Sequence, residues 1–246
     1  MPVFFIEPGL IHEGILSITG PLARHLSGSL RVRPGELLWL AEAGGSRYQV
    51  RVSAVDRTRV TAQVVSESSV PPATTPCITL GLALVKGAHM DWAVQKATEL
   101  GVARLVPLLT RRSVVRPKAE RSDQQTRRWR SIALEAAQQS MRWDIPVVTV
   151  PTSFEAWCTG TDCHTPRLIF WEDPRATPLR ERLRGRPQPT SVALAIGPEG
   201  GFEADEIELA TKNGFEAVSL GPRILRTESA VLAVLTILQY EWGDLG

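Results

Sequence analysis

Apolar and polar positions alternate in the first part of the chain. Every second residue is apolar in segments 48–54 and 60–64, which is the period of two expected for strands with one buried face. Turn-forming residues at 43–46 and 56–58 bound these strands. The pattern up to about residue 70 therefore predicts a small β-barrel.

The pattern changes after a stretch rich in proline and small polar residues at 68–76. Such stretches usually connect domains, so we place a boundary near residue 72 and expect domains at 1–72 and 73–246. Beyond the boundary, apolar segments of strand length alternate with helical patterns. Strands are predicted at 77–85, 102–109, 167–171, 191–196 and 216–220, and helices at 91–100, from Ser122 and from Thr152.

This alternation predicts an α/β fold in which helices cover both faces of a parallel sheet. Ser122 and Gln125 have the spacing of a capping box at a helix start, and so do Thr152 and Glu155. Segment 173–189 has only weak periodicity. We expect it to be a mobile excursion that lines the site.

Composition limits the class of protein and the cellular compartment that we expect. A chain of 246 residues that is 43% hydrophobic can bury a sizeable core and fold unaided. Cys77, Cys158 and Cys163 cannot form a disulfide framework, which fits a reducing cytoplasm. Cys158, Cys163 and His164 are close in sequence, but a tetrahedral metal site needs four ligands at finger-like spacing, so we expect no metal. We expect no secretory signal and no membrane span, since the apolar segment 231–238 is too short.

The formal net charge is only +2, but basic residues cluster locally. Between Arg104 and Arg130 there are nine basic residues and two acidic ones. Such a patch can neutralise phosphates and give an affinity for RNA that depends on salt. A solvated helix face or loop explains the same charges equally well.

Two glycine-proline turns carry the clearest chemical signal. Segments 197–201 (GPEGG) and 221–223 (GPR) each follow an apolar strand and each lead into a helix. Ligands bind at the carboxyl ends of strands in an open α/β sheet, and glycine lets a ligand approach the backbone. Neither turn has the P-loop or dinucleotide pattern. Either turn alone would serve as a plain connection, but the pair predicts one site for a ligand with a flat apolar part and a charged centre.

Five blocks of the sequence resemble one family. Segments 196–202 (IGPEGGF) and 220–230 (LGPRILRTESA) resemble the paired signature of the 16S ribosomal RNA uridine-N3 methyltransferases of the SPOUT superfamily. Segments 25–35, 86–102 and 135–142 are similar to the other blocks of that family, so the resemblance spans nearly the whole chain. Within the last block, Met141 occupies a place where the family usually has a small residue.

The resemblance implies a PUA-like RNA-binding β-barrel at 1–72. It implies a SPOUT domain at 73–246, whose carboxyl-terminal segment is threaded into a trefoil knot with the two glycine turns as its ligand loops. The implied cofactor is S-adenosylmethionine, and the implied active unit is a homodimer with each cofactor pocket near the subunit interface. The implied partner is 16S ribosomal RNA or the small ribosomal subunit.

The resemblance also assigns roles to residues of both turns. The cofactor would be held by Ile196, Gly197, Gly200, Gly201, Leu220, Gly221, Ile224 and Leu225. The larger of these would equally suit an ordinary core. Arg226 is the first candidate for catalysis because a guanidinium can stabilise the negative charge that spreads over the uridine oxygens, although a salt bridge to Glu228 is an alternative. Glu199 would orient Arg226 or accept a proton, or it would only hold the turn through backbone amides.

Six arginines are candidates for contacts with RNA phosphates. They are Arg31 and Arg33 in the barrel domain, and Arg111, Arg112, Arg116 and Arg142 in the catalytic half. These contacts would position a uridine that has to leave its base pair before N3 can be reached.

The resulting hypothesis is transfer of a methyl group from S-adenosylmethionine to N3 of a uridine in small-subunit ribosomal RNA. Neutral N3 carries a proton, so the site has to accept that proton or stabilise the charge that its loss creates. A non-catalytic RNA-binding protein of ribosome assembly is the alternative. A third alternative is a nucleotide-dependent enzyme that acts on small molecules. This alternative gives the barrel domain and the arginine cluster no function.

Overall fold

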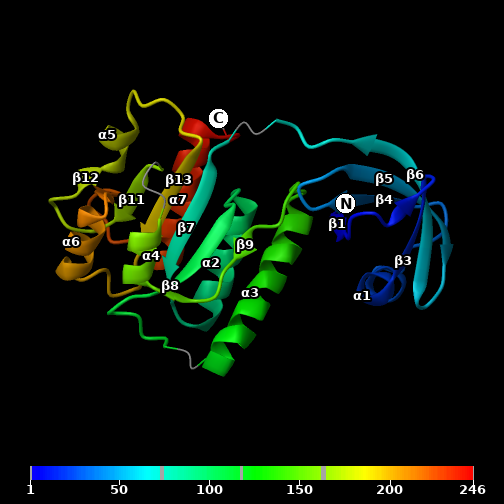
Figure 1. Ribbon diagram of the computed structural model, residues 1–246, viewed down its shortest axis with the longest axis horizontal. Coiled ribbons are helices and arrows are strands. Elements are labelled where there is room, and N and C mark those ends of the chain that lie inside the picture. The colour runs from blue at the N-terminus through cyan, green and yellow to red at the C-terminus, as the bar shows by residue number, and fades with distance from the viewer. Residues whose placement is uncertain (1, 73–74, 117–118, 162–164, 246) are drawn as a thin grey trace. The chain divides into compact units, whose positions relative to one another are not determined.

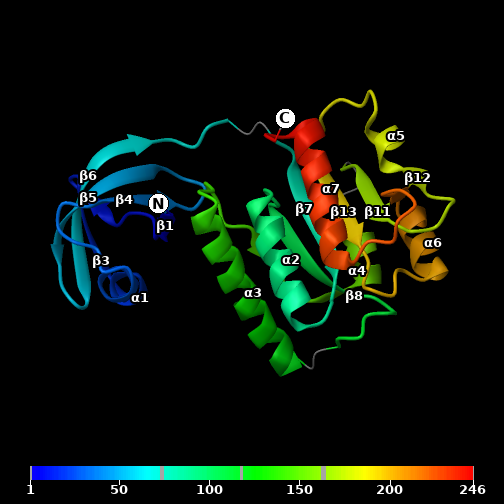
Figure 2. The ribbon, with the colours of Figure 1, turned by 180° about the vertical axis from the view of Figure 1, so that it is seen from behind.

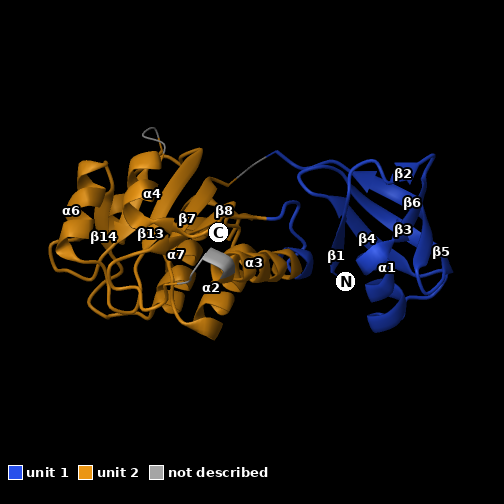
Figure 3. Cartoon of the chain, turned by 60° about the horizontal axis from the view of Figure 1, so that its bottom comes forward, with its two compact units in different colours: residues 1–72, 137–145 blue, residues 73–136, 146–246 orange. Residues whose placement is uncertain are grey.

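The structure is a computed structural model that describes residues 2–72, 75–116, 119–161 and 165–245. It divides into two compact units, residues 1–72 with 137–145 and residues 73–136 with 146–246 (Figure 3). Segment 137–145 thus belongs by its contacts to the first unit, which the pattern of the sequence did not indicate.

The first unit is built on a curled sheet with strand order β1-β4-β5-β6-β3-β2 (Figure 1). All its strand pairs are antiparallel except β1 with β4. The strands are β1 (Val3–Ile6), β2 (Ile11–His12), β3 (Ile15–Thr19), β4 (Leu37–Glu42), β5 (Arg47–Val55) and β6 (Arg59–Ser68). A short helix, α1 (Gly20–Arg24), continues into a π-helical turn, η1 (His25–Ser29).

The period of two in β5 and β6 is confirmed. Val50, Val52, Val60 and Ala62 are buried on the inner face of the sheet. Ala54 is exposed instead, because the register shifts between Val52 and Ala54. Such a shift moves the following side chains out of the alternating pattern.

Arg47 of β5 holds segment 137–145 to the strands. Its Nη2 donates to the carbonyl oxygens of Met141 and Arg142 at 2.7 and 3.0 Å, and its guanidinium lies 3.9 Å from the ring centroid of Trp143. Burial lowers the pKa of Arg47. Met141 has φ 58°, in the left-handed region where any residue with a Cβ is strained, so glycine is the residue that would relieve the strain at this position.

The second unit is built on a parallel sheet with strand order β10-β8-β7-β13-β11-β14-β12, and β9 pairs with β8. Its strands are β7 (Cys77–Ala83), β8 (Arg104–Leu109), β9 (Val147–Val148), β10 (Thr152–Ser153), β11 (Arg167–Phe170), β12 (Thr177–Pro178), β13 (Ser191–Ile196) and β14 (Glu216–Ser219). Its helices are α2 (Gly87–Glu99), α3 (Ala119–Gln139), α4 (Phe154–Gly160), α5 (Leu179–Leu183), α6 (Ala204–Lys212) and α7 (Thr227–Trp242). The last three residues of α3 are grouped with the first unit.

Helices cover both faces of this sheet, as the alternation of elements predicts. Residues of α2, α3, α5 and α7 share one core with Leu194 and Ile196 of β13. Residues of α4 and α6 form a second core with the intervening Ala193 and Ala195. Figures 1 and 2 show α2, α3 and α7 on one face of the sheet and α4 and α6 on the other.

Three predicted helix starts are wrong by a few residues. Helix α2 begins at Gly87 rather than at 91. Ser122 lies inside α3, because the good helix formers that precede it extend the helix. Helix α4 is capped not by Thr152 but by Ser153, the last residue of β10, whose Oγ accepts from the backbone N–H of Ala156 at 3.1 Å.

Segment 173–189 is also more regular than its sequence indicates. It contains β12, which pairs with β14, and helix α5. Leu179 and Leu183 of α5 are buried in the first of the two cores. A helix this short shows only two apolar positions, which is too few to reveal a period.

Gly81 lies within β7, where Trp157 of α4 packs directly against the backbone. A Cβ at residue 81 would lie 2.7 Å from Cζ2 and 2.8 Å from Cη2 of Trp157. The strand has no room to shift because it pairs with β8 on one side and β13 on the other. We expect Gly81→Ala to lower the free energy of unfolding by about 1–3 kcal/mol, measured by guanidinium denaturation.

Gly160→Ala is the matched control for Gly81→Ala. Gly160 is exposed at the end of α4, and no atom lies within 4 Å of the Cβ that alanine would add. This substitution should be neutral or slightly stabilising. Equal loss of stability in both variants would show that the contact between Gly81 and Trp157 does not determine the packing here.

Candidate active site

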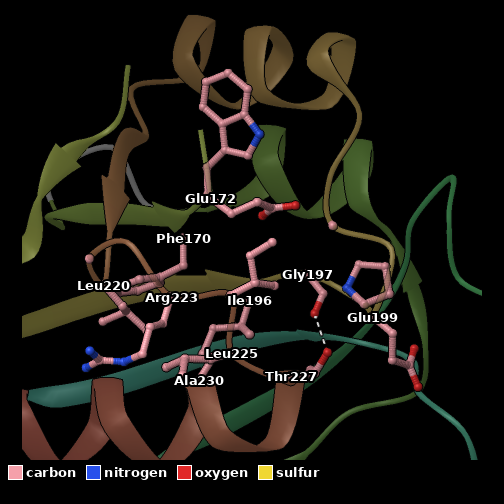
Figure 4. A pocket seen from close by; sticks show the side chains of 15 residues that line it. Phe170, Glu172, Ile196, Gly197, Glu199, Leu220, Arg223, Leu225, Thr227 and Ala230 are labelled. Atoms are coloured by element: carbon pink, nitrogen blue, oxygen red, sulfur yellow. Dashed lines mark hydrogen bonds between the residues drawn. The ribbon is translucent and has the colours of Figure 1, made fainter. Parts of the chain in front are cut away.

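Three neighbouring strands end at the same edge of the parallel sheet. β11 lies between β13 and β14 and pairs with both in parallel. The segments that follow these strands line one cavity, together with the start of α7 (Figure 4). The empty space of the cavity is about 580 Å³, a value that includes the part open to solvent at its mouth. Because the cavity is open to solvent, its lining and not its volume indicates the kind of ligand that it can hold.

The lining of the cavity has an apolar part and a polar part. The apolar lining comes from Phe170, Trp171, Ile196, Pro198, Leu220, Ile224, Leu225 and Ala230. The polar lining comes from Glu172, Glu199, Arg223, Thr227 and the backbone of the glycines. Figure 4 shows Glu172 extending over Ile196, whereas Glu199 extends away from it, on the outer side of the segment that follows β13. The two carboxylates therefore face different parts of the site.

Two loops shape the cavity: the first glycine loop, 197–203, and the second glycine loop, 220–226. Gly201 and Gly221 have φ values of +70° and +105°, which side chains rarely adopt. A Cβ on Gly201 would overlap the carboxylate of Glu172. Thr227 is buried, and its Oγ1 donates to the carbonyl oxygen of Gly197 at 3.0 Å. This bond fixes the first loop to the helix that follows the second.

An aromatic ring at the rim is held in place by two charged neighbours. The guanidinium of Arg175 lies 4.9 Å from the ring centroid of Trp171. Arg175 in turn makes two side-chain hydrogen bonds to Asp173, at 2.7 and 2.8 Å. These bonds lower the pKa of Asp173 to about 2, so its carboxylate stays ionised and keeps the guanidinium in position.

The structure brings most of the predicted cofactor and catalytic residues together. The cavity is lined by Ile196, Gly197, Gly201, Leu220, Gly221, Ile224 and Leu225, and by Glu199. Gly200 does not line it, and its carbonyl oxygen accepts from Arg112 on the outer side of the loop. Arg226 is exposed directly before α7 and does not line it either. Glu228, the alternative partner of Arg226, instead contacts His89 at 3.0 Å.

The predicted RNA-binding arginines are divided between the two units. Arg31 and Arg33 are exposed in the first unit, after η1. Arg142 also belongs to the first unit, not to the catalytic half, and it is bonded to Asp144 at 2.9 Å. The remaining three lie in the second unit, on the loop that follows β8, where they bond carboxylates and backbone carbonyls. Arg111, Arg112 and Arg116 are nevertheless exposed on that loop.

Sequence reasoning missed several residues of the cavity. Phe170 ends β11, and Trp171 and Glu172 follow it directly. The position of β11 between the other two strands is not visible in the sequence. Segment 173–189, which was expected to line the site, contributes no residue to the cavity. Glu172 could have been found in the sequence as a charged residue directly after a predicted apolar strand.

No group of three or more His, Cys, Asp or Glu that could hold a metal ion occurs among the described residues. Cys163 and His164 lie outside the described residues. Cys158 is buried, and burial raises the pKa of its thiol to about 12, so it stays protonated. In the part of the chain that the structure describes, no helix is long and apolar enough to span a membrane.

Residues 73–239 match the family described as RNA methyltransferase domain, which defines the class of this protein. The ribosomal RNA small subunit methyltransferase E of Mycobacterium bovis is 32% identical over 249 residues, covering 98% of this chain and 93% of the relative. The chain belongs to the family of ribosomal RNA small subunit methyltransferase E.

Two solved structures resemble the whole chain. The crystal structure of a ribosomal RNA small subunit methyltransferase E from Neisseria gonorrhoeae, bound to S-adenosylmethionine, has a TM-score of 0.90 at 31% identity and covers 100% of both chains. A methyltransferase from Legionella pneumophila in complex with the same cofactor has a TM-score of 0.87 at 32% identity, covering 99% of this chain and 98% of its own. The similarity therefore includes both units.

Proposed function

We propose that this protein transfers a methyl group from S-adenosylmethionine to N3 of a uridine in 16S ribosomal RNA. The single observation that carries the proposal is the cavity shared by the two glycine loops and the end of β11. Its apolar lining suits an adenine ring, and the carboxylate of Glu172 suits the positive charges of the cofactor. Relatives of the same fold that contain this cofactor support the choice of ligand.

The cofactor-binding residues divide by what each contributes. Gly197, Gly201 and Gly221 leave the backbone open to the ligand, while Ile196, Leu220 and Leu225 supply apolar walls. Ile224 is 83% exposed at the mouth of the cavity, where bound ligand or RNA would cover it. Gly200 does not line the cavity. It contributes through the shape of the first glycine loop, because its carbonyl oxygen accepts from Arg112 on the outer side.

The bound cofactor supplies an electrophilic methyl carbon on its sulfonium. The reaction forms the bond from N3 to that carbon, breaks the bond from carbon to sulfur, and releases the N3 proton. We propose that Arg226 stabilises the negative charge on the uridine oxygens as the proton leaves. We propose that Glu199, which lines the cavity but extends away from Ile196, accepts the proton through water.

The proposal also includes the topology, the RNA-binding domain, the cellular location and the oligomeric state that the family resemblance implies. We infer a trefoil knot formed by the segments that carry the two glycine loops, a PUA-like role for the first unit in binding RNA, and action in the cytoplasm. We infer a homodimer as the active unit, with each pocket near the subunit interface. Exposed apolar residues on α7, Leu232, Ile237 and Tyr240, are consistent with cover by a second subunit.

Mass spectrometry of ribosomal RNA tests the reaction. RNA from cells that lack the protein should have lost one methyl group at a uridine, and purified protein with S-adenosylmethionine should restore it. The alternative is a non-catalytic protein of ribosome assembly, which need not bind the cofactor. Calorimetry with S-adenosylmethionine separates the two, because no binding and no lost methyl group would favour the assembly protein.

The first unit should contribute affinity for RNA through Arg31 and Arg33. Both side chains are exposed in the same short segment after η1. If both contact phosphates, replacing both with alanine should weaken RNA binding and reduce the slope of log affinity against log salt by about 2. The measurement is a series of binding titrations at different salt concentrations, and an unchanged slope would exclude both residues from the interface.

A further inference from the structure

The loop that follows β8 contacts the first glycine loop from its outer side. We call residues 110–116 the basic loop. Nη1 of Arg112 donates to the carbonyl oxygen of Gly200 at 2.8 Å, and its Nε lies 3.7 Å from Oε1 of Glu203. A Cβ on Gly200 would lie 3.4 Å from Cβ and Cδ of Arg112, so the side chain lies close along the glycine.

A buried carboxylate makes a second link between the same two loops. Glu206 of α6 is only 5% exposed. Its Oε1 accepts from the backbone N–H of Arg111 at 2.9 Å, and its Oε2 accepts from the backbone N–H of Glu203 at 3.0 Å. One side chain therefore joins the backbone of the basic loop to the last residue of the first glycine loop. Both oxygens are used, so the burial of this charge is compensated.

Arg111 adds a third link on the surface. Its Nη1 bonds Glu203 at 3.2 Å and Asp205 at 2.8 Å, and these hydrogen bonds raise the pKa of Arg111. Exposed ion pairs of this kind contribute little to stability. We therefore assign the main effect to the bond from Arg112 to a backbone carbonyl and to the buried Glu206.

These links act on the part of the loop that faces the cavity. Gly201 follows the carbonyl that Arg112 holds, and it lines the cavity beside Glu172. The N–H of Gly201 donates to the carbonyl oxygen of Pro198 at 2.9 Å, which closes the turn. The Gly200–Gly201 peptide is thus fixed from inside by its own turn and from outside by the basic loop.

We propose that Arg112 and Glu206 are positioning residues, which hold the first glycine loop in the shape that binds the cofactor. This inference rests on the proposed function, namely that the cavity binds S-adenosylmethionine. It changes the role of Arg112 from a phosphate contact to a support of the cofactor site. The two roles differ in what an alanine substitution would change.

Calorimetry with S-adenosylhomocysteine, together with salt titrations of RNA binding, distinguishes the two roles. Arg112→Ala should weaken binding of S-adenosylhomocysteine about tenfold, the effect of losing one charged hydrogen bond, and leave the salt slope unchanged. Arg112→Lys should show the same loss, because an ammonium lacks the planar fork that serves Gly200 and Glu203 together. A phosphate contact would give the opposite result, with an altered salt slope in Arg112→Ala, full rescue by lysine and unchanged cofactor affinity.

Two further variants complete the test. Arg180→Ala, on the exposed side of α5, removes an arginine that has no role in the site and should change neither quantity. Glu206→Gln keeps the size of the side chain but replaces one acceptor oxygen by a donor, so it should also weaken binding of S-adenosylhomocysteine. Circular dichroism melts verify that each variant is folded.

Hydrogen exchange of backbone amides gives a readout that needs no ligand. Exchange in segment 197–207 should become faster in Arg112→Ala and Glu206→Gln, and it should stay unchanged in Arg180→Ala. Unchanged exchange in both variants would overturn the inference. If wild-type protein fails to bind S-adenosylhomocysteine, the proposed function fails, while the exchange experiment still decides whether the basic loop holds the glycine loop.

Discussion

Replacing Arg226 with alanine should lower the turnover of RNA methylation about 10²- to 10³-fold and leave the affinity for S-adenosylhomocysteine nearly unchanged. Arg226 precedes α7 directly, is exposed, and does not line the cavity that we assign to the cofactor. Its guanidinium is therefore available to the second substrate. The loss should appear in kcat because the charge on the uridine oxygens develops only as N3 loses its proton.

Single-turnover methylation and calorimetry on the same preparations provide the measurement. Arg226→Lys should recover part of the rate, because an ammonium keeps the charge but not the planar pair of donors. Arg180→Ala serves as the arginine control, since Arg180 is exposed and does not line the cavity. If Arg226→Ala loses cofactor affinity and turnover in equal measure, Arg226 supports the pocket and does not act on the uridine.

The sequence predicts the layers of the second unit because each layer has a local signal. The strands 191–196 and 216–220 were apolar runs bounded by glycine-proline turns, and the structure has them as β13 and β14 within one residue. The helices after the turns are confirmed as α6 and α7. Buried parallel strands are uniformly apolar, so their extent can be predicted even when their order cannot.

The order of the strands in the sheet could not be predicted from the sequence. β11 lies between β13 and β14, although it precedes both in the chain. This order brings Glu172 to the cavity, and no local pattern indicates it. Conversely, Arg226 is the last residue of the second glycine loop but does not line the cavity. Proximity along the chain is thus a weaker guide to a site than the position of a strand in its sheet.

The arginines show a second limit of the sequence. A cluster of positive charges between Arg104 and Arg130 fits a phosphate-binding patch, yet several of these side chains have partners within the protein. Arg128 bonds Asp91, and Arg130 donates to the carbonyl oxygen of Val148. Arg112 is paired with a backbone carbonyl that is 88 residues away in the chain. Charge counts do not reveal such pairings, because the partners are distant in sequence.

Replacing Gly221 with alanine should weaken the binding of S-adenosylhomocysteine about ten- to hundredfold. Gly221 lines the cavity with φ +105°, and no atom lies within 4 Å of the Cβ that alanine would add. The effect therefore comes from backbone strain and not from a steric clash. Strain of this kind costs about 1–3 kcal/mol, which the second glycine loop can relieve only by changing its shape.

Gly185→Ala separates strain in the site from strain in general. Gly185 has φ +69°, is exposed after α5, does not line the cavity, and also has no atom within 4 Å of an added Cβ. Both variants should lose stability in urea denaturation, but only Gly221→Ala should lose affinity in calorimetry. Wild-type affinity in Gly221→Ala would mean that the second glycine loop does not hold the ligand. Equal loss of affinity in Gly185→Ala would mean that reduced stability of the fold, and not the shape of this loop, limits binding.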